Sequence, residues 1–347
     1  MKRMLVFVAI VSLMAGSLFA NEAVLIDFGL LTADVRIPVG PDDQETAPNQ
    51  NRATMMDFSG VRFGASFTDE QRSIMRTSLA IQNWEVEFAS SSRTIGNMIR
   101  SYTREAPSKQ FGTVMGVRIH FPLENFHSWA LIKPPFEIPA FDLSTVQDDG
   151  TIVQAQPEEG AAPAPSRFEE GHGVVKNVGT IKSIAVNVHG LNFPHGLSTV
   201  LIDGTTGERR SVFMGNLNFD GWGELRWDNP AYIQEVRNRD LRILPLYPTS
   251  TPFIKFAGFE IRRDGSQDGG DFITYFKDVK IIYDQAVLEG ERDIDDEGLW
   301  RIIQDREAAR SVWEMERFGQ NQVLRHLESQ RMATTSDFTP ANAAGQE

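Results

Sequence analysis

The chain has 347 residues, a formal net charge of −13 and no cysteine, and hydrophobic residues make up 41% of it. The acidic balance argues against nucleic acids and anionic membranes as partners, because both bind basic surfaces. A chain of this length can bury a core large enough to fold without disulfides, so we expect packing alone to stabilise it.

The first twenty residues have the layout of a secretory signal peptide. Lys2 and Arg3 provide a positive start, an apolar run follows, and small residues precede Ala20. That run is too short for a membrane-spanning helix, and without cysteine the chain offers no site for a lipid anchor. We therefore predict an exported, soluble protein that begins near residue 21 and inserts into no membrane.

Between residues 21 and 290 the sequence predicts a β-rich domain. Short β-branched and aromatic runs recur between Gly, Pro, Asn and Asp, and no helical period is sustained before about residue 295. Apolar and polar residues alternate in several runs, as in a strand with one buried face. The expected strands cover residues 24–28, 83–89, 114–121, 128–133, 180–189, 198–203, 209–214, 224–227, 241–244, 254–262 and 272–283.

Many short strands without alternating helices favour two packed antiparallel sheets. We predict a mainly β fold, an antiparallel β-sandwich of the jelly-roll type. Two polar stretches rich in Pro and Ala interrupt it, at residues 38–52 and 147–166. They contain few residues that could enter a core, so we expect flexible surface loops there.

The character of the sequence changes near residue 291. Residues 291–332 are rich in charge, and apolar residues recur at helical spacing from Leu299 to Trp313. Acidic residues at 293–297 suit the positive end of a helix dipole. We predict an amphipathic helix that docks on the sandwich or on a neighbouring subunit, followed by a disordered tail over residues 333–347.

Signals of enzymatic chemistry are weak. The chain has no cysteine nucleophile, nucleophile elbow, P-loop or dinucleotide-binding glycine pattern. His189 and His195 could bind a metal, but no third ligand follows at a recognisable spacing. A glycoside hydrolase would need two carboxylates across a cleft, for which Asp220 with Glu224 is one arbitrary choice. We therefore predict no enzymatic activity.

One acidic turn has some features of a calcium loop. Asp264, Asp268 and Asp271 stand at or near the spacing of oxygen ligands, and Gly269 would allow a sharp turn. The closing glutamate is missing, and Tyr275 occupies its position. A polar turn between two strands explains the same residues and is the interpretation we favour. Calcium remains an alternative, and otherwise we expect no cofactor.

Residues 215–233, GNLNFDGWGELRWDNPAYI, concentrate aromatic residues between turn formers. Trp222 lies between two glycines in an expected turn and is the better candidate for exposure, whereas Trp227 alternates with Leu225 and is expected to face the core. An exposed Trp can bury roughly 150–250 Å² against a sugar ring or another protein. The candidate partner-binding or glycan-binding residues are Trp222, Trp227, Tyr232, Trp300 and Trp313.

Four segments together carry a family resemblance. They are VLIDF at residues 24–28, WEVEF at 84–88, FDGWGELRWDNPAYI at 219–233 and FKDVKIIYD at 276–284. The third segment is the most specific, and the likeness extends over most of the chain. These segments resemble the spirochaete FlaA family of flagellar filament outer-layer, or sheath, proteins.

The resemblance implies a periplasmic structural protein that coats the flagellin core of the periplasmic flagellum and contributes to filament stiffness or shape. It also implies a jelly roll similar to galactose-binding domains and carbohydrate-binding modules, and it supplies no catalytic residues. The implied partners are core flagellins and sister sheath subunits, with glycans on the flagellins as a further means of attachment. The alternative functions are a secreted carbohydrate-binding protein with the same sandwich and, third, a glycoside hydrolase.

Overall fold

The structure is a computed structural model. It describes residues 20–32, 54, 56–57, 76–139, 144–146, 152–154, 168, 170–241, 252–286, 294, 296–303, 305–306, 309, 313 and 316–319. The expected signal peptide up to residue 19, the expected tail, the loop at residues 38–52 and most of the loop at 147–166 lie outside these residues. Among the described residues, no helix is both long and apolar enough to span a bilayer.

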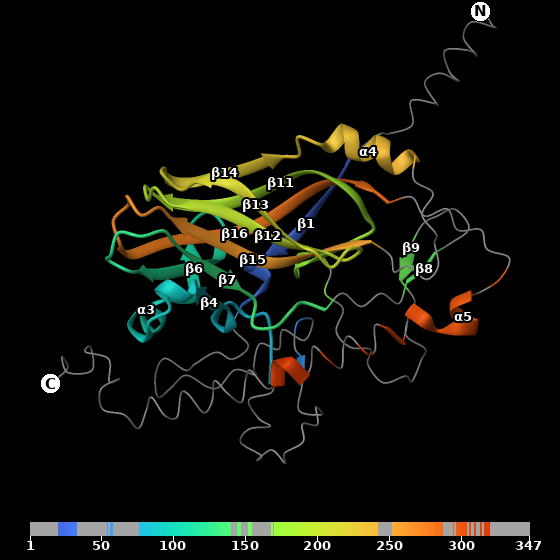
Figure 1. Cartoon of the computed structure of the whole chain (residues 1–347), viewed down its shortest axis with the longest axis horizontal. Helices are drawn as coiled ribbons and strands as arrows, with labels where there is room; N and C mark the ends of the chain where they lie inside the picture. The colour runs from blue at the N-terminus through green and yellow to red at the C-terminus, as the bar shows by residue number, and fades with distance from the viewer. Residues whose placement is uncertain are drawn as a thin grey trace, which may run out of the picture.

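Two six-stranded antiparallel sheets form the body of the molecule (Figure 1). The first sheet has the order β14 (Asp220–Asp228), β11 (Val178–Leu191), β16 (Gly270–Gln285), β6 (Gly112–Phe121) and β5 (Tyr102–Ser108), with β1 (Asn21–Asp27) also beside β16. The second has the order β13 (Arg209–Asn216), β12 (Gly196–Asp203), β15 (Phe253–Arg263), β7 (Ser128–Lys133) and β4 (Glu85–Phe88), with β10 (Val174–Lys176) also beside β15.

Short elements complete the described part of the chain. Two small pairs are β2 (Met56–Asp57) with β3 (Arg76–Thr77) and β8 (Ser144–Val146) with β9 (Ile152–Gln154). The α-helices are α3 (Ile95–Arg100), α4 (Tyr232–Leu241) and α5 (Asp296–Trp300), and the 3-10 helices are η1 (Phe28–Leu30), η2 (Ile81–Asn83) and η3 (Ser90–Ser92). The strand β9 falls inside the stretch that we expected to be a loop at residues 147–166.

The predicted mainly β, antiparallel sandwich is confirmed. β7 has the predicted bounds, and in β6 Val117, Ile119 and Phe121 are buried while the residues between them are less so. Successive strands repeatedly cross from one sheet to the other, at β6 to β7, β11 to β12, β13 to β14 and β15 to β16. This alternation is compatible with the predicted jelly-roll type.

Two local predictions were wrong. Residues 220–223 belong to β14 instead of a turn, and Leu241, expected to begin a strand, is the last residue of α4. The helix α4 has the sequence YIQEVRNRDL, in which charged residues dilute any apolar stripe, so periodicity did not reveal it. Strand β5 and helix α3 were not predicted either.

Aromatic rings fill the space between the two sheets. Phe259 of β15 and Phe276 of β16 stack with ring centroids 4.0 Å apart and an interplanar angle of 11°. Phe28 and Phe256 extend this stack, and Trp84 packs edgewise on Phe28 at 5.2 Å. The core therefore joins the sheets through one continuous set of rings, each of which contributes a large buried apolar area.

Phe318 of the C-terminal helical segment packs into this core. Phe318 is 5% exposed, belongs to the main apolar cluster, and packs on Phe136 with centroids 6.0 Å apart. The predicted helix is interrupted, because α5 ends before Arg301, which has φ 54 in the left-handed region. Leu299, which belongs to the predicted apolar stripe, is 68% exposed.

A buried arginine binds together the crossings at one end of the sandwich. Arg263, at the end of β15, is 1% exposed. Its guanidinium donates hydrogen bonds to the carbonyl oxygens of Pro122 (2.7 Å), Glu124 (3.0 Å) and Gln267 (2.8 Å). The first two lie in the β6–β7 crossing and the third in the β15–β16 crossing. Gln267 also donates to the carbonyl of Pro194, in the β11–β12 crossing, at 2.8 Å.

A buried histidine lies beside these crossings. His195 is 4% exposed, and its ring stacks on Phe121 at 5.1 Å and lies 4.8 Å from that of Phe272. Neither ring nitrogen has a hydrogen-bond partner within the part of the chain that the structure describes. Burial, with the nearby positive charge of Arg263, lowers the pKa of His195 to about 4, so the imidazole is neutral in the folded protein at neutral pH.

Replacing Arg263 by methionine should destabilise the fold strongly. The Arg263→Met variant leaves one buried and two partly buried carbonyl hydrogen bonds without their charged donor, and we expect the free energy of unfolding to fall by about 3 kcal/mol. The neighbouring Arg262 is exposed, so Arg262→Met is the control and should change stability by less than about 0.5 kcal/mol. Urea denaturation of the chain without residues 1–20 tests this, and equal midpoints for the two variants would contradict it.

The buried histidine predicts a loss of stability in mild acid. The unfolded chain takes up a proton on His195 near pH 6.5 and the folded chain only near pH 4, so stability decreases as the pH falls through that window, by on the order of 3 kcal/mol in total. In His195→Phe the ring volume is kept and this contribution is absent. Denaturation at pH 7 and pH 4 should show a smaller loss for the variant, and an identical loss would contradict the assignment.

Candidate functional site

Trp222, His189 and Tyr275 form a row on the outer face of the first sheet. The strand register places Trp222 of β14 opposite His189 of β11, and His189 opposite Tyr275 of β16. Residues directly opposite in antiparallel strands point to the same face. Their chain neighbours Val188 and Phe276 are buried in the core, so the row points away from it. The ring centroids are 5.2 Å and 5.7 Å apart, at interplanar angles of 86° and 89°.

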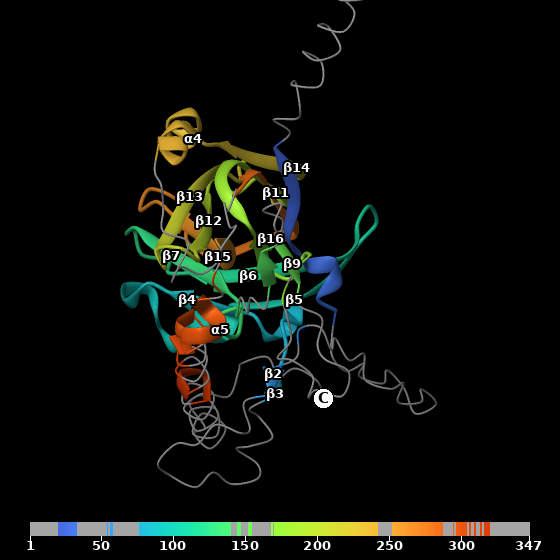
Figure 2. The same cartoon turned by 90° about the vertical axis from the view of Figure 1, so that its right-hand side faces the viewer.

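A fourth ring comes from the turn between β5 and β6. The centroid of Phe111 lies 4.9 Å from that of Trp222, at an interplanar angle of 79°. Two strands, β16 and β11, separate β6 from β14 in the sheet order. The end of the hairpin must therefore lean over the outer face to reach Trp222, and Figure 2 shows the β5–β6 region extending from the sheet on the side of β1 and β14.

These four residues, Phe111, His189, Trp222 and Tyr275, are called the outer aromatic cluster. Trp222 is only partly exposed, with a ring packed near it on two sides. It therefore packs between a hairpin and the sheet and is less exposed than the sequence suggested, and its role as a binding residue stays a prediction. The Nδ1 atom of His189 is enclosed and has no hydrogen-bond partner among the described residues.

Glycines explain both the cluster and the wrong prediction of a turn. A Cβ on Gly116 of β6 would lie 3.2 Å from Cε1 of Tyr275, so glycine gives the tyrosine ring room over the strand. On the inner side, a Cβ on Gly190 would lie 2.4 Å from the Phe219 carbonyl oxygen, and one on Gly223 would lie 3.0 Å from the Phe219 ring. The glycine near Trp222 marks close packing within a strand.

Trp227 and Tyr232 have structural contacts. Trp227 points inward and packs on the core, as predicted, and the Arg210 guanidinium lies 5.1 Å from its ring. Tyr232 begins α4, and its hydroxyl donates a hydrogen bond to Asp284 of β16 at 2.7 Å. Tyr232 follows the last residue of β14, whereas Trp222 lies near the first. These aromatic residues therefore do not form one surface.

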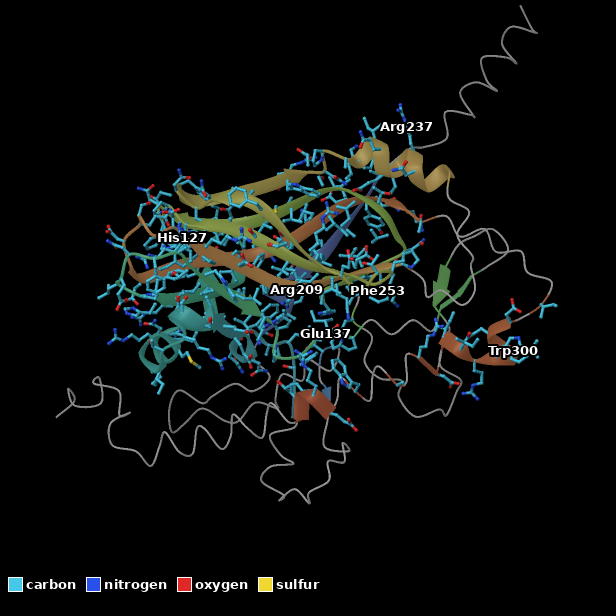
Figure 3. All side chains as sticks on the ribbon, in the orientation of Figure 1. His127, Glu137, Arg209, Arg237, Phe253 and Trp300 are labelled. Atoms are coloured by element: carbon cyan, nitrogen blue, oxygen red, sulfur yellow. The ribbon has the colours of Figure 1, made fainter. Side chains whose placement is uncertain are left out.

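Trp300 and Trp313 are the most exposed of the candidate aromatic residues. Trp300 is 67% exposed in α5 and Trp313 is 57% exposed in the helical segment that follows. Figure 3 shows Trp300 at the end of the molecule away from His127. Arg317 covers part of the Trp313 ring at 5.6 Å. Both side chains are therefore available to a partner in a way that Trp222 is not.

The paired residues considered for chemistry are held apart. His189 lies on the outer face of the first sheet and His195 in the core, so they do not converge on a metal. Asp220 and Glu224 lie on one strand, four residues and roughly 13 Å apart. Carboxyl groups of glycoside hydrolases are about 5–9.5 Å apart.

Comparison with known proteins identifies the family. Residues 47–292 match the model of FlaA, described as flagellar filament outer layer protein. A protein of Treponema pallidum named flagellar filament outer layer protein is 46% identical over 99% of this chain and 98% of its own length. One of the same name from Spirochaeta aurantia is 45% identical over 94% of this chain and 91% of its own. The chain belongs to the FlaA family.

Two solved structures align with this chain at much lower identity. A carbohydrate-binding module of the β-sandwich superfamily aligns at 9% identity over 64% of the FlaA chain and 63% of its own, with a TM-score of 0.29. A second module, solved in complex with β-1,4-galactotriose, aligns at 11% identity over 58% and 88%, with a TM-score of 0.25.

The FlaA turn that was considered for calcium is occupied by internal contacts. Asp264 accepts hydrogen bonds from the Ser266 amide (2.9 Å) and hydroxyl (2.8 Å). Asp271 lies at the start of β16 and binds Arg118 at 2.8 Å and His120 at 2.8 Å. The described residues contain no group of three or more His, Asp or Glu side chains placed to hold a metal.

The Asp271 contacts form a polar network beside the aromatic cluster. The hydrogen bond from Arg118 and, less strongly, that from His120 lower the pKa of the Asp271 carboxyl. The other ring nitrogen of His120 lies 3.1 Å from Arg100, at the end of α3. Arg118 and His120 alternate with the buried residues of β6, but alternation could not show that both meet a carboxylate 153 and 151 residues later in the chain.

Removing Phe111 should release the β5–β6 hairpin without unfolding FlaA. An aromatic pair of this kind contributes about 0.5–1.5 kcal/mol beyond its buried area. In Phe111→Ala we therefore expect amide hydrogen exchange at residues 108–114 to become roughly tenfold faster, with little change in the core strands. Phe213→Ala, which removes a ring that is 54% exposed, is the control and should leave the hairpin unchanged. Unaltered exchange in Phe111→Ala would contradict the fastening role.

Proposed function

We propose that this chain is a non-enzymatic structural subunit of the outer layer of a periplasmic flagellar filament, where it packs on a flagellin core. Family membership carries the proposal, because relatives of almost the same length, 45–46% identical, are named flagellar filament outer layer proteins. The N-terminal segment with the layout of a signal peptide supports export to the periplasm.

The distribution of polar groups supports a structural role. The buried Arg263 binds backbone carbonyls, Asp271 is paired with Arg118 and His120, and Tyr232 is bonded to Asp284. These contacts hold strands and crossings together. Groups of exposed apolar side chains lie elsewhere, on and beside α3 and α5, with further single ones such as Leu123 and Phe213. This arrangement suits a rigid body that presents contact surfaces better than it suits a catalytic cleft.

The sandwich also supports a contribution to filament stiffness. The continuous aromatic core, together with the hydrogen bonds by which Arg263 joins the crossings at one end, gives a body that resists deformation. Rigid subunits placed outside a flagellin core add material at a larger radius, where it opposes bending most. Weak contacts suffice for each subunit, since neighbours on the same filament turn them into collective attachment.

Cosedimentation with filaments tests the proposal. The chain without residues 1–20 is mixed with flagellin filaments from cells that lack this protein, before and after chemical deglycosylation of the filaments. We expect saturable pelleting that persists after deglycosylation, because packing between proteins holds the layer. Pelleting lost only with the sugars would favour attachment through glycans on the flagellin. No pelleting with either preparation would contradict the proposal and favour a free carbohydrate as the target.

A further inference from the structure

Helix α3 is turned with its apolar residues toward solvent. Ile95, Met98 and Ile99 are 45%, 41% and 45% exposed, whereas Asn97 is buried. Tyr102, at the start of β5 and 41% exposed, continues the same stripe one turn later. A surface helix ordinarily buries its apolar stripe and exposes its polar side. The four side chains Ile95, Met98, Ile99 and Tyr102 are called the α3 patch.

Hydrogen bonds hold α3 in this orientation. The Asn97 side chain donates to the carbonyl of Ser92 at 2.9 Å, and the Asn97 carbonyl accepts from the Ser101 hydroxyl at 2.7 Å. Thr94 caps the helix by accepting the Asn97 amide hydrogen at 3.2 Å. All three bonds lie on the inward side. The apolar side is therefore displayed by a fixed helix and not by a frayed one.

Positive charge surrounds the α3 patch in a chain of net charge −13. Residues 93–104 contain three arginines and no acidic residue. Arg93, Arg100 and Arg104 are all exposed. Interfaces bury an apolar centre within a polar rim, and opposite potentials select the partner. The α3 patch thus suits an apolar surface with an acidic rim.

Helix α5 has the complementary composition. Residues 293–300, DIDDEGLW, contain four acidic residues, and Arg292 and the exposed Arg301 flank them. Ile294, Leu299 and Trp300 are 56%, 68% and 67% exposed, and these three side chains are called the α5 patch. In Figure 1, α3 and α5 lie toward opposite ends of the long axis of the molecule. One chain therefore carries both halves of a complementary pair, toward opposite ends of the molecule.

We propose that the α5 patch of one copy of this chain docks on the α3 patch of the next copy, in a head-to-tail contact. This inference rests on the proposed outer-layer function, which places many copies side by side. Two different patches at opposite ends make a heterologous contact that can repeat along a filament without closing on itself. A symmetric contact between two α3 patches would bring like charges together, which opposes it.

The absence of cysteine from the chain permits a direct test by cross-linking. Cells whose only copy carries Ile99→Cys and Leu299→Cys together are grown, and their isolated filaments are oxidised and run on a non-reducing gel. We expect a ladder of covalent multimers of this chain. Either substitution alone should leave monomers. The control pairs Leu299→Cys with Leu123→Cys, an apolar residue 73% exposed outside the α3 patch, and should give no ladder.

Other outcomes would overturn the inference in recognisable ways. Dimers from Ile99→Cys alone would show a symmetric contact, and a compact cross-linked monomer would show that the chain covers its own α3 patch. Normal filament occupancy without any cross-link would exclude the contact and leave the proposed function standing. Absence of the unmodified chain from filaments would instead reject the proposed function, and the inference with it.

A second measurement needs no cross-link. Ile99→Ser and Leu299→Ser should each lower the amount of the chain on filaments at least fivefold relative to Leu123→Ser. Both positions are exposed, so the thermal unfolding midpoint of each purified variant should match that of the unmodified chain. Equal occupancy of all three variants would overturn the inference even if the cysteine variants failed to assemble.

Discussion

The fold depends on how one buried guanidinium binds the crossings at one end of the sandwich. Each crossing between the sheets leaves carbonyls that no strand can pair, and buried carbonyls without a partner are costly. Arg263 has a planar fork of donors that serves carbonyls in two crossings at once, and Gln267 links a third. β6 ends and β16 begins at the crossings that Arg263 binds. Their outward residues Arg118, His120 and Asp271 can pair because these two strands are held in register there.

The surfaces follow from this clamped end. Once β6 is fixed, its hairpin partner β5 forms the edge of the first sheet, and α3 must bridge from β4 at the edge of the second sheet to β5. This connection is short. Its polar residues form hydrogen bonds with the backbone on the inward side, so its apolar residues face solvent. At the other end of β6 the hairpin is free of the clamp and is fastened by Phe111 on Trp222. The apolar residues of α3 and the ring of Phe111 therefore lie in connections outside the core between the two sheets.

The sequence predicted the strands in which one face is apolar. It did not predict features that depend on contacts between residues far apart in the chain. The strands at residues 114–121, 128–133, 254–262 and 272–283 were predictable because one face of each is apolar. Trp222 was misplaced, since glycines mark tight packing around Phe219 as readily as they mark a turn. Helix α3 was missed because it has few residues and an inverted stripe. The role of Arg263 had no local signal, since its partners lie up to 141 residues away. The exposure of Trp300 and Trp313 agrees with their selection as candidates, and their role as binding residues stays a prediction.

The modest size of the α3 and α5 patches is itself suited to a coat. A handful of side chains is far fewer than the 20–30 residues a side that stable interfaces use, so one such contact would not hold two free subunits together. The net charge of −13 opposes association in solution as well. In the proposed layer, a flagellin core holds each subunit near its neighbours. The high effective concentration then makes a weak head-to-tail contact sufficient. Under the proposed arrangement, subunits would stay apart after export and join only where the core has aligned them.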